Sequence, residues 1–151
     1  MRLQLVGLFA ALLSMAADAP KEDVEKELGK LQGKWRLVGL EESKKEEIDF
    51  DKAPILPIKD DRLKDVPYEG KKLEMLIELD PSQKPKAINL TYISPDGKSK
   101  GDSFLAIYAL EGDTLRICFT PKEKGAKRPK EFATKGEGAG LFMWTLKRDK
   151  P

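Results

Sequence analysis

The sequence predicts a mostly β fold, a small antiparallel up-and-down barrel preceded by one short helix. Short segments that alternate apolar and polar residues recur along the chain, turn signals separate them at regular spacing, and a single early stretch has the period of a helix. The chain has 151 residues, of which 40% are apolar. This length suits one domain with a core of ordinary size.

The start of the chain predicts a secretory signal peptide over residues 1–16. A basic residue follows the initiating methionine, the stretch up to Ala16 is almost entirely apolar, and the chain becomes charged at Asp18. A transmembrane helix needs about 20 apolar residues, so this segment is too short to be one. We expect cleavage after Ala16 and a secreted or periplasmic location. The alternative is a hydrophobic helix packed on the domain.

Residues 17–33 contain the predicted N-terminal helix. Within them, the stretch Pro20–Gln32 carries Val24, Leu28 and Leu31 on one face, at the spacing of a helix, with charged residues elsewhere. A proline at its start and a glycine after its end agree with these limits. So narrow an apolar face cannot hold a helix alone, and we expect this helix to lie against the rest of the domain.

Residues 34–151 have the pattern of a β-barrel domain. The clearest strands are bounded by turn residues and are Trp35–Glu41, Leu73–Leu79, Ala87–Ile93, Phe104–Leu110, Thr114–Phe119 and Leu141–Lys147. Two of them, Phe104–Leu110 and Leu141–Lys147, are apolar on both faces. One face of such a strand can line the barrel interior, and the other needs cover from the helix or from a partner protein.

Residues 42–68 combine dense charge with three prolines, which obscures any alternation. Short edge strands are expected around Ile48–Phe50 and Ile55–Ile58. A further strand is expected near Glu131–Thr134, before a glycine-rich turn at residues 136–140.

Several motifs resemble one domain family. Leu31-Gln32-Gly33-Lys34-Trp35 is the Gly-x-Trp opening of lipocalin-like barrels, preceded by their usual short helix. The other motifs are Leu79-Asp80-Pro81, Pro85-Lys86-Ala87-Ile88, Ile107-Tyr108, Leu110-Glu111-Gly112-Asp113-Thr114-Leu115, Cys118-Phe119, Arg128-Pro129 and Leu146-Lys147-Arg148. From about Leu28 to Arg148 the chain resembles an uncharacterised lipocalin-like domain family that is abundant in planctomycete bacteria. The resemblance implies a barrel fold and a bacterial envelope or secreted location. It implies no established activity, although lipocalin-like proteins in general bind small apolar molecules inside the barrel.

The charge balance argues against a nucleic-acid partner. The chain has 28 Lys and Arg and 26 Asp and Glu, a formal net charge of +2, whereas a protein that neutralises phosphates carries a clear basic excess. Charged residues make up 36% of the chain, which indicates a solvated surface and no membrane span in the mature protein.

The residue types needed for most catalysis are missing. The sequence has no histidine, which removes the commonest general base, the usual nucleophile–histidine pairs and nearly all zinc sites. Cys118 is the only cysteine, so no intramolecular disulfide can form, and we interpret it as a small buried hydrophobe. The alternative is a reactive thiol beside Arg116, which would point to the same face of the strand. We predict a protein that is not an enzyme, with no catalytic residues and no cofactor. The alternative is a hydrolase that uses carboxylates alone.

Two further patterns suggest sites only superficially. The pairs Asp49/Asp51 and Asp60/Asp61 lack the glycine and the distal glutamate of a calcium loop, so no metal site is predicted. The glycines of residues 136–140 are not closed by the Lys-Ser/Thr of a phosphate-binding loop, and we interpret them as a flexible turn.

The apolar alternation selects the residues that would line the barrel. Trp35 is predicted to plug one end with Arg148 or Lys147 laid across its ring, as a late basic residue does in lipocalin-like folds. The predicted ligand-binding residues of the interior are Trp35, Leu37, Met75, Ile77, Tyr92, Phe104, Tyr108 and Ile117. An open interior would hold a small apolar or amphipathic molecule, with Tyr92 or Tyr108 as a polar contact. The alternative is a filled barrel that serves as a structural or protein-interaction module of the cell envelope, through an outer apolar face that includes Phe142 and Trp144.

Overall fold

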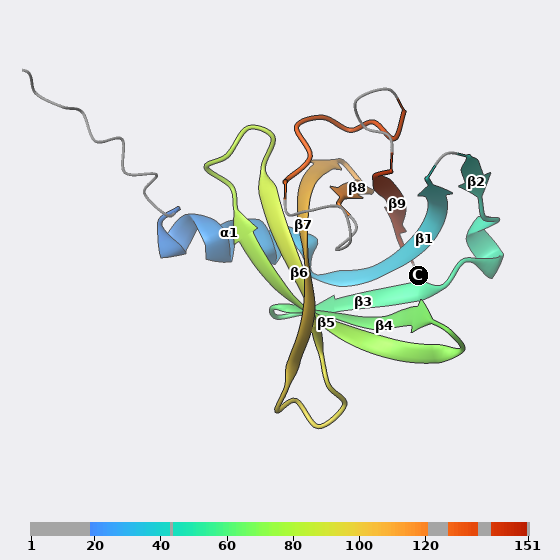
Figure 1. Cartoon of the computed structure of the whole chain (residues 1–151), viewed down its shortest axis with the longest axis horizontal. Helices are drawn as coiled ribbons and strands as arrows, with labels where there is room; N and C mark the ends of the chain where they lie inside the picture. The colour runs from blue at the N-terminus through green and yellow to red at the C-terminus, as the bar shows by residue number, and fades with distance from the viewer. Residues whose placement is uncertain (1–18, 43, 121–126, 136–139, 151) are drawn as a thin grey trace, which may run out of the picture.

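The computed structural model describes residues 19–42, 44–120, 127–135 and 140–150. Over these ranges the predicted fold class is confirmed, because the chain forms an 8-strand antiparallel up-and-down barrel with one short N-terminal helix (Figure 1). This architecture is consistent with a lipocalin-like fold. The predicted signal peptide, residues 1–16, and most of the glycine-rich turn, residues 136–139, lie outside the described residues.

The elements follow one another in a simple order. They are α1 (Lys21–Leu31), β1 (Gly33–Glu41), β2 (Lys45–Glu47), the 3-10 helix η1 (Phe50–Lys52), β3 (Ile55–Lys59), β4 (Arg62–Tyr68), β5 (Lys71–Asp80), β6 (Ala87–Ile93), β7 (Lys100–Glu111), β8 (Thr114–Phe119) and β9 (Phe142–Arg148). Each strand from β3 to β9 pairs with its sequence neighbour, and β9 pairs back onto β1. That last pairing closes the barrel. The short β2 lies beside the last residues of β1 only.

A β-bulge in β1 decides which of its residues face inward. Leu37 pairs with Leu146 and Gly39 with Thr145, so Val38 is the extra residue on β1. Successive strand residues point to opposite faces, and an extra residue reverses that alternation. Leu40 therefore lies on the inner face, although regular alternation from Leu37 would have turned it outward.

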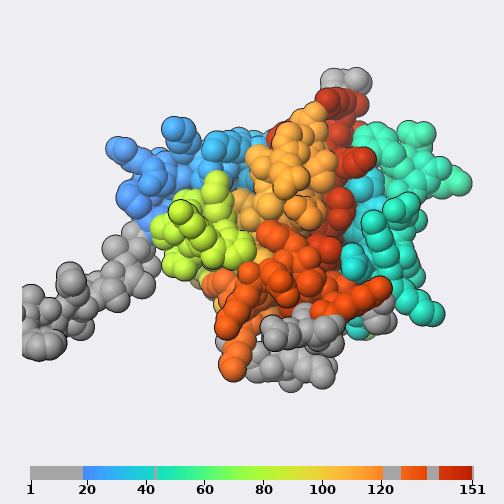
Figure 2. Space-filling model, turned by 90° about the horizontal axis from the view of Figure 1, so that it is seen from above, coloured from blue at the N-terminus to red at the C-terminus, as the bar shows by residue number. Residues whose placement is uncertain are grey.

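The helix α1 closes one end of the barrel. Leu31 is 1% exposed and belongs to the main core, and Val24 and Leu28 pack against that core. Figure 1 shows α1 at the end of the barrel opposite the β1–β2 hairpin, and Figure 2 shows it beside the β5–β6 turn. β1 starts at Gly33 beside α1 and ends at Glu41, so it connects the closed end with the other end. We refer to that other end as the mouth.

A segment of the same chain covers the outer face of β6 to β8. Arg128 donates hydrogen bonds to the carbonyl oxygens of Ile88 (3.1 Å) and Ala106 (2.7 Å) and to Asn89 Oδ1 (2.8 Å). Beneath this segment Ile107 is 1% exposed and Cys118 is fully buried. The doubly apolar β7 was expected to need cover from the helix or from a partner protein, and residues 127–134 of the same chain provide it instead.

The poorly patterned segment, residues 42–68, contains two strands that the sequence did not predict. β4 was missed because a bulge between Leu63 and Val66 puts residues three positions apart on the same face, and Asp65 within it has a φ of 56°. β2 was missed because its three residues are all exposed and carry no apolar pattern. Pairing with β1, and not burial, holds β2 in place.

Two expected strands are wrong, and one is confirmed. Phe50, expected to end an edge strand, instead begins η1, where Asp49 Oδ1 accepts a hydrogen bond from the backbone N–H of Asp51 (3.2 Å). Glu131–Thr134 is irregular and belongs to the covering segment. The strand expected at Ile55–Ile58 is present as β3. In the described ranges, no helix is long and apolar enough to cross a membrane.

Candidate functional site

All of the predicted lining residues face the barrel interior. Six of them are at most 4% exposed and pack in one core cluster: Trp35, Leu37, Met75, Ile77, Tyr108 and Ile117. Tyr92 and Phe104 are half-buried and pack against that cluster. Side chains therefore fill the interior beside α1. A ligand role for these residues stays a prediction.

Trp35 and Arg148 lie together at the closed end. The Trp35 indole N–H donates to the Leu31 carbonyl oxygen (2.8 Å), and the Arg148 guanidinium lies 4.3 Å from the Trp35 ring centroid. Arg148 also donates to the carbonyl oxygens of Gln32 (2.9 Å) and Lys30 (3.0 Å), at the C-terminal end of α1. Gly33 has a φ of 122°, and a Cβ there would lie 3.3 Å from Arg148 Nη1. The glycine of the Gly-x-Trp motif thus lets the arginine approach the end of the helix.

A buried carboxylate on α1 was not predicted. Glu27 accepts hydrogen bonds from Tyr108 Oη (3.0 Å) and Lys30 Nζ (2.7 Å), and Lys86 Nζ lies 3.0 Å away. Burial raises the pKa of Glu27, but the hydrogen bonds from Lys30, Lys86 and Tyr108 outweigh it and lower the pKa to about 2. Glu27 lies three residues after Val24, on the edge of the apolar stripe, and that position is the signal the sequence offered.

Glu27 also binds Tyr108, one of the two tyrosines predicted as a polar contact for a ligand. The Tyr108 hydroxyl donates to Glu27, and burial, followed by this hydrogen bond, raises the pKa of Tyr108. Tyr108 therefore helps to fix α1 on the barrel. Its hydroxyl already donates a hydrogen bond within the chain, to Glu27.

The mouth contains a pocket of about 430 Å³, at the opposite end of β1 from Trp35. Its described lining combines three apolar residues, Leu40, Phe142 and Trp144, with four charged ones, Glu41, Glu42, Lys44 and Glu46. The apolar members are only partly buried, and they pack onto the core cluster from its open side.

The strand register brings the pocket residues together. Leu40 on β1 pairs with Glu46 on β2 and with Trp144 on β9, so these three side chains lie in a row on the inner face. Phe142 and Trp144 pair with Phe119 and Ile117, which are core residues. The expectation that Phe142 and Trp144 form an outer apolar face is therefore wrong. They are inward residues at the mouth.

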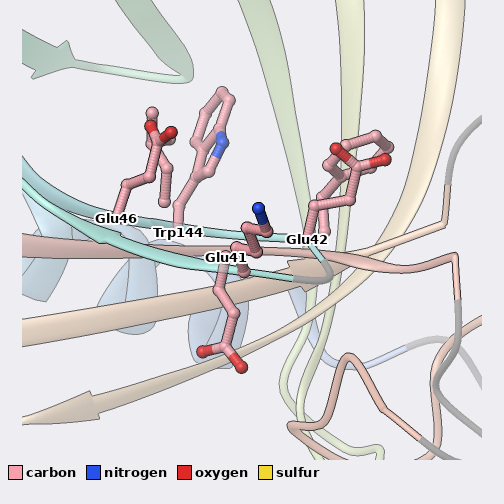
Figure 3. A pocket seen from close by; sticks show the side chains of 7 residues that line it. Glu41, Glu42, Glu46 and Trp144 are labelled. Atoms are coloured by element: carbon pink, nitrogen blue, oxygen red, sulfur yellow. The ribbon is translucent and has the colours of Figure 1, made fainter.

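Figure 3 shows how the charged residues of the pocket are placed. Glu42, Glu46 and Trp144 project to the same side of the hairpin, and Glu41 projects to the other. Glu41 Oε1 accepts a hydrogen bond from Thr134 Oγ1 (2.7 Å), on the covering segment. Glu42 and Glu46 are exposed, and their carboxylates belong to the pocket.

Aromatic rings continue from this pocket across the mouth. Phe119 contacts Trp144 edge-to-face at 5.0 Å between centroids and stacks on Phe142 at 5.4 Å. Phe104 lies 5.9 Å from Phe119, and Tyr92 lies 5.5 Å from Phe104. These contacts hold the Trp144 and Phe142 rings in fixed positions at the border between the core and the pocket.

Cys118 is buried, and Arg116 contacts other side chains of the protein. Cys118 is on the outer face of β8, and burial raises its pKa, which disfavours the thiolate. The Arg116 side chain lies over the Phe132 ring (5.1 Å) and pairs with Glu111 (3.2 Å). No set of three potential metal ligands (His, Cys, Asp, Glu) that could hold an ion occurs in the described ranges.

The sequence reasoning missed Leu40, Glu42, Lys44 and Glu46 as pocket residues. Two of them flank a hairpin turn whose second strand has no apolar pattern, and Leu40 faces inward only because of the bulge. Comparison with family models, curated proteins and solved structures found no match to this chain.

Proposed function

We propose that this protein is an exported, non-enzymatic binding protein that holds a small apolar or amphipathic molecule at the mouth of its barrel. The observation that carries the proposal is the pocket of about 430 Å³ lined by Leu40, Phe142 and Trp144. Ligand pockets are concave, largely apolar sites of about 300–1,000 Å³ with a few polar groups. The mouth has this size, and its apolar residues lie beside four charged ones.

The placement of the aromatic rings supports a ligand. Phe142 and Trp144 belong to the inner face of the sheet, yet they stay partly exposed because no segment of the described chain covers them as α1 covers the closed end. A bound apolar group would remove this surface from water, at about 25 cal/mol per Å². The absence of histidine from the sequence and the burial of Cys118 support a role in binding over one in catalysis.

Export is proposed from the sequence of residues 1–16, and the bacterial envelope from the family resemblance. Mass spectrometry of the protein purified from its source tests this proposal directly. We expect a mature chain that begins at Ala17. A mature protein that retains residues 1–16 would contradict export through this segment.

Native mass spectrometry of the same material tests the binding proposal. We expect a reproducible small mass bound to the folded protein, which is lost in Trp144→Ala and retained in Met143→Ala. Met143 neighbours Trp144 on β9 but points outward, which makes it the matched control. A small mass that survives in Trp144→Ala would place the ligand elsewhere.

One observation favours a second candidate, a filled barrel that serves as a structural or protein-interaction module of the cell envelope. The side chains near α1 fill the closed half of the interior, where Trp35 and its cross-strand partner Leu56 are fully buried. A protein that carries no small mass from its source, and whose Trp144 fluorescence does not respond to apolar probes, would support this candidate.

A further inference from the structure

The charges around the mouth pocket are unequal. Of the described residues that line it, three carry carboxylates and one, Lys44, carries an ammonium group. Glu41 turns away and accepts a hydrogen bond from Thr134, which leaves Glu42 and Glu46 on the side of the aromatic rings. Two carboxylates against one ammonium group make this side of the pocket negative, and a negative cleft with low-dielectric walls favours cations.

The two tryptophans differ in whether a cationic side chain of the protein lies over the ring. The Trp35 ring carries Arg148 at 4.3 Å, and the rings of Phe50 and Phe132 likewise carry Arg36 and Arg116. In the part of the chain that the structure describes, no arginine or lysine lies over Trp144. Trp144 therefore has the kind of ring that binds cations best and lines a pocket with carboxylates, but no cationic side chain of the described residues lies over it.

We propose that the ligand of the mouth pocket is a small organic cation with an apolar body, such as an alkylamine or an alkyl quaternary ammonium compound. This inference rests on the proposed function and specifies its ligand class. The cationic group lies over the Trp144 ring, on the side of the hairpin that also carries the carboxylates of Glu42 and Glu46. The apolar body lies against Leu40 and Phe142.

The geometry of the hairpin supports this orientation. Glu46, Leu40 and Trp144 are consecutive partners across three strands, so an apolar side chain separates the carboxylate from the indole on one continuous surface. A ligand whose charge lies on the Trp144 ring can bury its apolar part on Leu40, while Glu46 at the far end of the row adds negative charge to the same surface. Neighbouring strands are about 4.8 Å apart, so the row is short enough for one small molecule to contact all three side chains.

The test compares three probes that share a ten-carbon chain and differ in their head groups. They are decyltrimethylammonium, decanoate and the neutral decyl glucoside, each used below its micelle concentration. Binding to the full chain is measured by tryptophan fluorescence and by calorimetry. We expect the cation to bind about tenfold more tightly than the anion at low salt, and added salt to reduce this preference.

Single substitutions locate the charge effect. Glu46→Gln is expected to weaken binding of the cation about fivefold and to leave the neutral probe unchanged, since an exposed charge pair contributes up to about 1 kcal/mol. Lys44→Gln is expected to act in the opposite direction and strengthen binding of the cation. Glu47→Gln is the matched control, because Glu47 is the next residue of β2, pairs with Gly39 and lines a different, outer pocket.

The outcomes separate this inference from the proposed function. If all three probes bind equally, or if decanoate binds best, the cation preference is overturned and the binding proposal stands. If Glu47→Gln weakens the cation as much as Glu46→Gln, the site is not the mouth and this inference fails. If no probe binds, both proposals fail.

Discussion

The two tryptophans illustrate how neighbouring residues determine what one side chain can do. Trp35 is fully buried, its indole N–H donates to Leu31, and Arg148 covers its ring. Trp144 is partly buried, stacks edge-to-face on Phe119 and borders a pocket. The first residue completes the core at the closed end. The second leaves aromatic surface available at the mouth.

Trp35→Ala is expected to lower the free energy of unfolding by about 3–5 kcal/mol, because it removes a large, fully buried side chain and leaves a cavity under α1. Urea unfolding followed by circular dichroism measures the change. Trp144→Ala serves as the comparison and should cost less, since its ring is only partly buried. If Trp35→Ala leaves stability almost unchanged, Trp35 does not stabilise the closed end.

Glu27 is expected to make stability depend on acid pH. Its folded-state pKa of about 2 lies below the ordinary value of 4.5, so its ionised form stabilises the fold above pH 4.5 and this contribution is lost as pH falls from about 4.5 to 2. Between pH 7 and pH 3, Glu27→Gln should lose about 2 kcal/mol less stability than the wild type.

Urea unfolding at the two pH values measures this difference. Glu25→Gln, on the exposed side of the same helix, is the control and should behave as the wild type does. An identical pH dependence in Glu27→Gln and the wild type would show that the contacts of Glu27 with Tyr108, Lys30 and Lys86 contribute nothing measurable.

The elements differ in how well the sequence predicted them, and the differences have physical causes. Ala87–Ile93 and Thr114–Phe119 were predicted with the limits that the structure has, because unbroken apolar patterns end at clear turns. β4 was not, because its bulge changes a two-residue period into a three-residue step between Leu63 and Val66. β2 exists only through pairing with β1, and nothing within its own sequence could have predicted it.

The pocket at the mouth was not predicted from the sequence for a related physical reason. The alternation of single strands correctly turned Trp35, Leu37 and Ile117 to the inside. The pocket, however, depends on the bulge in β1 and on the register that sets Leu40 between Glu46 and Trp144. Register between strands is a tertiary property, so a pattern read one strand at a time does not reveal it.

Two glycines in regular elements are expected to respond in opposite ways to replacement by alanine. Gly29 lies in α1, and a Cβ there would meet no heavy atom within 4 Å, so Gly29→Ala should stabilise the protein by about 0.5–1 kcal/mol through helix propensity. At Gly39 in β1 a Cβ would lie 3.1 Å from Thr145 Cβ, so Gly39→Ala should destabilise it. Thermal unfolding of both variants measures the two signs. A destabilising Gly29→Ala would mean that α1 packs differently from the structure described.

At the scale of the whole molecule, closure places every barrel strand between two neighbours. β1 pairs with β9 from Trp35–Arg148 to Glu41–Met143, so this seam runs from the closed end to the mouth. A closed barrel has no free edge strand that can separate first. Cys118 is the only cysteine, so this pairing and the core hold the fold without an intramolecular disulfide.

Because the barrel is closed, we expect its two ends to unfold together. Trp35→Phe leaves Trp144 as the only tryptophan and reports on the mouth, whereas Trp144→Phe leaves Trp35 and reports on the closed end. Within each variant, the urea midpoint from fluorescence should equal the midpoint from circular dichroism, which is the behaviour of a single cooperative unit. Because each variant is its own reference, a loss of stability in Trp35→Phe does not affect the comparison. A fluorescence midpoint below the circular dichroism midpoint in Trp35→Phe alone would show that the mouth opens first. The β1–β9 pairing would then not couple the pocket to the closed end around Trp35, and the pocket would exist only in part of the native ensemble.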